Sequence, residues 1–331
     1  MHRTDRQVPI FSGEDTPHPD PSSPFADVGT NVHLEQMKEM LLTYNEYNKD
    51  LGYVQGMSDL LAPIYAVIQD DAIAFWAFQK FMERMERNFL RDQSGMRSQL
   101  LTLDQLVHFM DPKLWDHLES TDSTNFFFFF RMILVWYKRE FAWMDILRLW
   151  ETLWTDYLSA NFHLFVALAI LEKHRDVIMT HLKAFDEVLK YSKLILNSSI
   201  TNARSLTETT VNELSNSIDL ESTLIRAEVL FRRFQRLVDA VDKKDTFPKP
   251  RIEGGKTSTK DEAESSKTTS SSQQNKANSA KGSSKGKDTA KKERPLADRV
   301  ITPELRKLLS RNLEILPRET VAKKGEGMPE R

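Results

Sequence analysis

Apolar residues recur at intervals of three and four from residue 31 to about residue 241, and this spacing is typical of helices that share a core. No part of this region shows the sustained apolar–polar alternation that indicates a sheet. The pattern therefore predicts an all-α domain built from many helices. The expected helices cover residues 33–47, 58–68, 72–90, 96–110, 112–118, 126–137, 141–157, 161–172, 185–191 and 220–241.

Composition divides the rest of the chain into polar flanks. Residues 1–30 are rich in Pro, Asp and Ser and are expected to form an irregular lead-in. Residues 242–301 are rich in Lys and Ser, and a segment with so few large apolar residues cannot offset the entropy of ordering. We therefore expect a disordered linker there, a short amphipathic helix over 302–316, and a disordered end over 317–331. That helix could dock on the domain or on a partner.

Local residues give the expected helix ends and interiors. Either Thr30 or Asn31 can cap the first helix, and Ser58 is a capping type of residue at the start of the second. Pro63 is expected to kink the second helix or to mark its first turn. The segments 126–137 and 141–157 are apolar nearly all round, so both are expected in the interior.

Composition also excludes several classes of protein. A net charge of −2 over 331 residues gives no global reason to expect nucleic acid as a partner. The chain has no cysteine, which excludes disulfides and thiolate metal sites and fits a reducing compartment. Its N-terminus lacks the apolar core of a secretory signal, and the apolar segment 126–137 is shorter than a membrane span and carries Arg131. We expect an intracellular protein without a transmembrane segment.

One glutamine and one arginine are candidates for chemistry. Gln55 lies in the run Tyr53-Val-Gln-Gly-Met57, where the second helical pattern begins, and Arg3 lies in the terminal run of residues 1–6. An amide that orients water and a guanidinium that balances phosphate charge are two groups that GTP hydrolysis needs. Judged by composition alone, however, Gln55 is more often a surface or capping residue, and Arg3 a solvated one.

Other constellations lack the spacing that their chemistry requires. Gly254-Gly-Lys-Thr257 imitates the end of a phosphate-binding loop, but Pro250 occupies the position of the first glycine. The histidines show no zinc-binding pattern, and the aromatic residues from 126 to 154 follow the spacing of a core. Arg139, Glu140, Asp145 and Arg148 lie in the same apolar zone, and we interpret them as buried ion pairs that fix helix register.

Several blocks together resemble the TBC domain of Rab GTPase-activating proteins, in particular the fungal activators of the vacuolar Rab and their animal relatives. The blocks are residues 2–6, Asp50-Leu-Gly-Tyr-Val-Gln-Gly-Met-Ser-Asp-Leu-Leu-Ala-Pro63, Ala74-Phe-Trp-Ala-Phe78, Lys138-Arg-Glu-Phe141, Asp145-Ile-Leu-Arg-Leu-Trp-Glu151 and Asn161-Phe-His-Leu164. The resemblance covers residues 1 to about 241.

This resemblance implies a helical domain that binds a Rab GTPase in its GTP state and is not itself a hydrolase. Arg3 matches the family's catalytic arginine, and Gln55 matches the glutamine that orients the attacking water. Tyr53, Gly56 and Met57 are then expected to contact the Rab or its GTP. No cofactor is expected, because the GTPase holds GTP and Mg²⁺. A vacuolar or late-endosomal Rab, and a cytoplasmic protein that is peripheral on those membranes, are what the resemblance implies.

Two departures from the family pattern shape our expectations. The family places an Ile-x-x-Asp motif before its arginine and an Arg-x-x-x-Trp helix further upstream, and neither precedes Arg3 here. We therefore expect an N-terminally truncated chain with an unanchored Arg3 and weak activity. Residues 192–210 form an insertion, either a surface loop or translated intron. The alternative function is a Rab-binding or scaffold protein of the same fold that is impaired in catalysis.

Overall fold

The computed structural model describes residues 5, 7–13, 22, 30–184, 187–188, 219–245 and 300–313. Within these ranges it contains helices and no β-strand, which confirms the all-α prediction. The α-helices are α1 (Val32–Tyr47), α2 (Met57–Ile68), α3 (Asp71–Met85), α4 (Ser94–Met110), α5 (Pro112–Ser120), α6 (Phe130–Leu134), α7 (Trp143–Trp154), α8 (Phe162–Lys173), α9 (Arg175–His181), α12 (Leu220–Asp245) and α13 (Pro303–Lys307). Three short 3₁₀ helices are η1 (Pro9–Phe11), η3 (Glu86–Asn88) and η4 (Phe127–Phe129).

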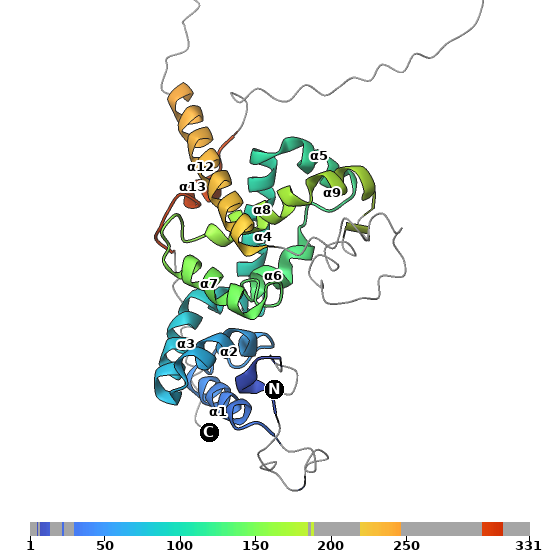
Figure 1. Cartoon of the computed structure of the whole chain (residues 1–331). Helices are drawn as coiled ribbons and strands as arrows, with labels where there is room; N and C mark the ends of the chain where they lie inside the picture. Colours follow the sequence, from blue (N-terminus) through green and yellow to red (C-terminus); the bar gives the residue numbers. More distant parts are fainter. Residues whose placement is uncertain are drawn as a thin grey trace, which may run out of the picture.

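The helices are arranged in two groups that meet at α6 and α7. Figure 1 shows α1, α2 and α3 at one end of the molecule, beside the N-terminal segment, and α4, α5, α8, α9 and α12 at the other. The helix α8 is buried along nearly its whole length, and α12 packs against it. Phe165 of α8 contacts Phe231 and Phe234 of α12, with ring centroids 5.1 Å and 5.6 Å apart.

The first helix follows its local sequence closely. Asn31 caps α1, because its Oδ1 accepts hydrogen bonds from the backbone N–H groups of His33 and Leu34. The same side chain donates from Nδ2 to the carbonyl oxygens of Ile10 and Ser12. Asn31 therefore fixes both the start of α1 and the N-terminal segment that carries η1.

The second helix starts one residue earlier than expected and without a side-chain cap. Gly56, at φ 108°, precedes Met57, the first residue of α2, so the prediction that Ser58 caps this helix is wrong. Pro63 lies inside the helix, neither at its end nor in its first turn. The reason for the early start is that only glycine adopts this backbone angle easily, which lets the chain enter the helix abruptly.

The prediction of one continuous helix over residues 126–137 is wrong. It divides into η4 and the five-residue α6, and Phe126, Trp136 and Tyr137 all have positive φ. Carbonyl groups that a helix would use internally accept hydrogen bonds from distant side chains here. Asn88 Nδ2 donates to Ile133 and Leu134, and Trp150 Nε1 donates to Trp136.

Most of the aromatic residues belong to the core, as predicted. Trp136 and Trp150 are fully buried, whereas Phe127 and Trp154 are exposed. His163 and His174 are buried, and no group of metal-ligating side chains occurs among the described residues.

The C-terminal helix is shorter than predicted. Only Pro303–Lys307 is helical in the described part of the 302–316 segment, and this helix docks on the domain. Residues 192–210 and most of the 242–301 linker lie outside the described residues. In the described part of the chain, no helix has the length and apolar character needed to cross a membrane.

Candidate functional site

Gln55 lies at the end of a loop that connects α1 to α2. The loop begins at Asn48, which is buried and donates from Nδ2 to the hydroxyl of Tyr44. Asn45 Oδ1 accepts a hydrogen bond of 3.0 Å from the backbone N–H of Tyr53. The Gln55 side chain is exposed, and we find no hydrogen bond from it to any described residue. The loop backbone is thus fixed from behind while the amide faces solvent.

Gly56 holds this loop close to the rest of the domain. A Cβ atom at Gly56 would lie 3.4 Å from the side chains of both Phe89 and Val135, and 3.8 Å from that of Leu134. The φ of 108° is strained for any residue with a side chain, although the space around the position would admit a Cβ at van der Waals contact. Gly56 therefore sets how deeply the Gln55 turn is seated against the segment that follows α6.

The three residues predicted to contact a partner have different exposures. Tyr53 is exposed and is available for such a contact. The Met57 side chain is 0% exposed, and Gly56 is buried beneath the loop. The prediction that the Met57 side chain contacts a partner is therefore wrong. Met57 instead supports the loop, because its Sδ accepts a 3.3 Å hydrogen bond from the backbone N–H of Val54.

A bidentate ion pair joins the first turn of α2 to the turn at residues 138–141. Arg139 Nε donates to Asp59 Oδ1 at 3.1 Å, and its second nitrogen donates to Asp59 Oδ2 at 2.7 Å. This contact with Asp59 raises the pKa of Arg139, so the guanidinium keeps its charge. Asp59 lies four residues after Gln55, and the pair therefore fixes the helix from which the Gln55 loop projects.

The turn at residues 138–141 also holds the N-terminal segment. Lys138 Nζ and Asp5 Oδ1 form an ion pair of 2.6 Å, and Lys138 Nζ lies 4.8 Å from the centroid of the Trp143 ring. Val8 and Phe11 are buried in the same core. Arg3 lies outside the described residues, so the expectation that it is unanchored stays a prediction, whereas Asp5, two residues later, is held by Lys138.

The ion pairs that we expected near residues 139–148 form only in part. Glu140 is buried and pairs with Arg131 at 3.2 Å, and its burial raises its pKa despite this cation. Asp145 is half-buried and Arg148 is exposed, and neither has an ion pair within the described part of the chain. Two of the four residues, Arg139 and Glu140, therefore form ion pairs as predicted, but their partners are Asp59 and Arg131, and the arginine of each pair is half exposed, so neither pair is fully buried.

A buried row of polar side chains supports the same region and was not predicted. Asn88 donates to the carbonyls of Ile133 and Leu134, and Gln99 Nε2 donates to Asn88 Oδ1 at 2.7 Å. His163 Nε2 lies 2.9 Å from Gln99 Oε1. Burial, with Arg87 and Arg84 nearby, lowers the pKa of His163 well below its usual value, so the imidazole is neutral. The three residues are far apart in sequence, and no local pattern indicates their contact.

The geometry is that of an exposed glutamine on a rigid helical support, with the N-terminal segment attached to the same support. A family model described as the Rab-GTPase-TBC domain matches residues 14–179 of the chain. The chain belongs to the Rab-GTPase-TBC domain family. The resemblance seen in the sequence blocks is thereby confirmed.

The chain is similar to several individual proteins. The chain is 56% identical over 253 residues to GTPase-activating protein GYP7 of Yarrowia lipolytica, a match that covers 74% of this chain and 32% of the relative. It is 42% identical over 219 residues to human TBC1 domain family member 17, covering 66% and 31%. The crystal structure of the Ypt/Rab-GAP domain of Gyp1p is 24% identical, with a TM-score of 0.45, and the match covers 59% and 66%. The chain spans about a third of the length of the curated relatives it matches.

Proposed function

We propose that this chain binds a Rab GTPase in its GTP state and stimulates GTP hydrolysis by that GTPase. Membership of the Rab-GTPase-TBC family and the printed names of the GYP7 relatives support this function. The observation that carries it is the exposed Gln55 side chain on a loop whose backbone is fixed on both sides. The chain acts as a regulator, and the hydrolytic centre belongs to the GTPase.

Each proposed residue has one chemical task. The Gln55 amide orients the attacking water in place of the glutamine of the GTPase, and the Arg3 guanidinium balances the charge that develops on the transferring phosphoryl group. An arginine supplied in this way is worth roughly 10³- to 10⁵-fold in rate. GTP and Mg²⁺ are held by the GTPase, so this chain contributes side chains only.

The fixed support favours the proposed role of Gln55. A catalytic group held in place before the partner arrives avoids reorganisation during the reaction, and a displacement of about 1 Å can cost about 100-fold. Asn45 and Gly56 fix the Gln55 loop, while Asp59 and Arg139 fix the helix behind it. Tyr53, an exposed residue of this loop, is the residue we assign to contact with the GTPase.

Single-turnover GTP hydrolysis tests the proposal. A panel of Rab GTPases loaded with GTP is mixed with the chain, with Gln55→Ala and with Arg3→Ala. Acceleration by the parent chain, lost in both variants, is the expected result. Gln69→Ala is a matched control, because Gln69 is an exposed glutamine at the other end of α2. Binding of a GTP-loaded Rab without acceleration would instead support the alternative, a Rab-binding or scaffold protein.

We further propose a vacuolar or late-endosomal Rab as the substrate, and a cytoplasmic protein that associates peripherally with those membranes. The support is the similarity to the GYP7 proteins. In the Rab panel, the vacuolar or late-endosomal member is expected to give the largest acceleration. A stronger response from a Rab of another compartment would overturn this assignment and leave the activity itself intact.

A further inference from the structure

The C-terminal segment 300–313 lies in a groove formed by α4, α12 and the loop of residues 156–161. Thr302 Oγ1 donates to Gln105 Oε1 of α4 at 2.6 Å and also caps α13 by accepting from the backbone N–H of Leu305. Arg306 forms a bidentate pair with Asp242 of α12, at 2.9 Å and 2.6 Å. The segment is thus held at two helices by side chains specific to each.

Leucine side chains supply the apolar part of this contact. Leu305 and Leu308 are only 2% and 1% exposed, and Ile301 and Leu309 pack against the same core from its edge. These positions follow the spacing of one helical face, so a single turn presents both buried leucines. Arg306 lies between them in sequence and points to Asp242, which sets the orientation of the turn in the groove.

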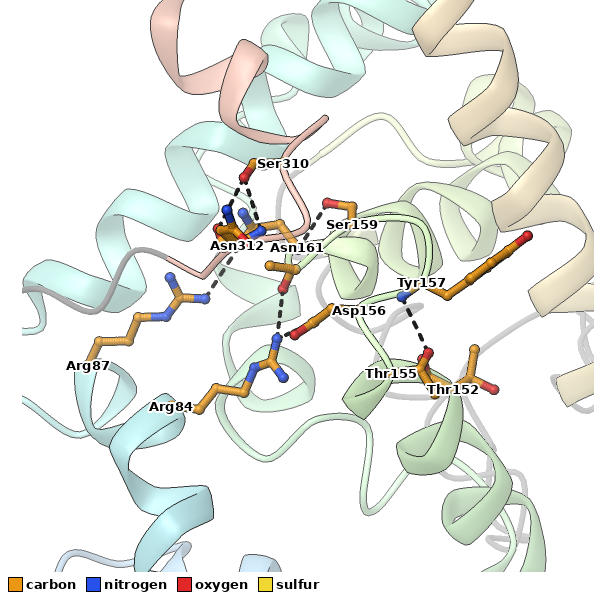
Figure 2. Close-up of polar contacts among 11 residues, drawn as sticks. Arg84, Arg87, Thr152, Thr155, Asp156, Tyr157, Ser159, Asn161, Ser310 and Asn312 are labelled. Atoms are coloured by element: carbon orange, nitrogen blue, oxygen red, sulfur yellow. Dashed lines mark hydrogen bonds and ion pairs between the residues drawn. The ribbon is translucent and has the colours of Figure 1, made fainter.

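The third wall of the groove is the 156–161 loop, which the segment and α3 hold from opposite sides. The backbone N–H of Ala160 donates to the carbonyl of Ser310 at 3.0 Å. Figure 2 shows Arg84 of α3 reaching the other face of the same loop, where it pairs with Asp156 and donates to the Ala160 carbonyl. The Arg311 guanidinium lies 5.4 Å from the centroid of the Tyr157 ring.

Residues 246–299 separate α12 from this segment in the sequence. Residues 254–292 contain almost no large apolar side chain, and the contacts described for the segment are those of residues 301–311. A covalent connection gives a bound segment an effective local concentration on the order of millimolar for a short linker and less for a longer one. A peptide of the same chemistry added in solution can therefore compete with the tethered segment.

We propose that this groove is a peptide-docking site and that residues 300–313 are its ligand in the same chain. The site takes a short helical peptide that carries a threonine cap, two leucines three residues apart and an arginine between them. The segment is treated as a ligand because its two fully buried side chains, Leu305 and Leu308, lie within or directly after one helical turn, and its remaining contacts lie at the edge of the core. This inference does not depend on the proposed stimulation of GTP hydrolysis.

Cleavage of the connecting sequence tests whether the segment is held by its own contacts. In the full chain, residues 265–271 are replaced by the recognition sequence of a site-specific protease, and the cut protein is passed over a size-exclusion column. The C-terminal fragment is expected to elute with the domain. A labelled synthetic peptide of residues 300–313 is expected to displace the C-terminal fragment at a temperature at which the domain remains folded. A fragment that elutes separately, or one that exchanges only when the domain unfolds, would overturn the proposal.

A charge reversal identifies the groove as the place of binding. Arg306→Glu in the peptide is expected to weaken its binding to the cut protein about tenfold or more, because Asp242 then faces a like charge. Asp242→Arg in the domain is expected to restore binding of that peptide. In the domain, Arg233→Glu is the matched control for Asp242→Arg. Arg233 is exposed on the same helix and has no contact with the segment among the described residues. If the parent peptide and the Arg306→Glu peptide bound the cut protein equally well, the groove would not be the place of binding.

Hydrogen exchange at one backbone amide, that of Ala160, measures whether the segment 300–313 is docked. The Ala160 N–H donates to Ser310, whereas the nearby Leu164 N–H donates to Asn161 within the domain. In the full chain, Arg306→Glu is expected to accelerate exchange at Ala160 and to leave Leu164 unchanged. Acceleration at both amides would indicate general unfolding and would count against a separable ligand.

Discussion

Asp5 and Lys138 form a buried ion pair across a separation of 133 residues, with side chains 9% and 4% exposed. Lys138 lies directly before Arg139, whose pair with Asp59 fixes the first turn of α2. The N-terminal segment and the helix behind Gln55 are therefore attached to neighbouring residues of one turn. The turn at residues 138–141 therefore holds both Asp5 and the helix that follows Gln55, although Asp5 and Asp59 are far apart in sequence.

Neutralising Asp5 is expected to release the N-terminal segment. Asp5→Asn leaves Lys138 without its partner carboxylate, and a buried unpaired cation is costly, so the segment is expected to detach. We predict a fall of about 10- to 100-fold in stimulated GTP hydrolysis, because the segment that follows Arg3 in the sequence is no longer held by Lys138. The measurement is single-turnover hydrolysis together with amide exchange at Val8 and Phe11, whose N–H groups donate within this segment. Asp116→Asn, at an exposed aspartate, is the control; a full rate in Asp5→Asn would show that the pair is dispensable.

A side chain at position 56 is expected to displace the Gln55 loop. Gly56→Ala must hold φ near 108° and bring a Cβ within 3.4 Å of Phe89 and Val135. Strain of this kind costs about 1–3 kcal/mol, and urea unfolding measures it. Stimulated hydrolysis is expected to fall by more than the loss of folded protein explains. Ser58→Ala, two residues later, is the comparison and is expected to change the free energy of unfolding by less than about 0.5 kcal/mol.

The Asp59–Arg139 pair is expected to respond unequally to loss of its two partners. Asp59 is 11% exposed and Arg139 is 49% exposed. Arg139→Met leaves a mostly buried carboxylate and is expected to cost about 2 kcal/mol in unfolding free energy, whereas Asp59→Asn leaves a hydrated guanidinium and is expected to cost about 1 kcal/mol. Arg148→Met, at an exposed arginine on α7, provides the baseline. Equal costs would show that burial of Asp59 does not control the energy of the pair.

Stability is expected to fall in acid because of buried histidines. Burial, with Lys173 nearby, lowers the pKa of His174 to about 4, while an unfolded histidine titrates near 6.5. Between these values the unfolded chain binds a proton that the folded chain excludes, so stability is complete above pH 6.5 and decreases as pH falls toward 4. At pH 5 this histidine accounts for a loss of about 2 kcal/mol.

The test compares variants, because carboxylates also contribute to the acid limb. His174→Gln is expected to have a shallower decrease in unfolding free energy between pH 6.5 and pH 5 than the parent chain. His181→Gln, at an exposed histidine, should follow the parent curve. The same slope in all three proteins would contradict a depressed pKa at position 174.

Local sequence was sufficient where a helix depends on its own residues. Val32–Tyr47 was predicted to within a residue, because Asn31 caps it and its buried face repeats at helical spacing. The same reasoning failed over 126–137. There, the side chains of Asn88 and Trp150 donate hydrogen bonds to the carbonyl oxygens of Ile133, Leu134 and Trp136. These tertiary contacts outweigh the helical preference of the segment. No local pattern records a hydrogen bond from a side chain so distant in sequence.

The division is the same at the candidate site. The sequence alone determined the all-α class, the family and the position of Gln55, since each of these depends on residue types at fixed spacing along the chain. Only the tertiary structure decided that Gly56 packs against Val135, that Asp59 pairs with Arg139, and that the N-terminal segment is held through Asp5. Those contacts join residues from separate helices and turns, and they exist only after the chain has buried its apolar faces in one core.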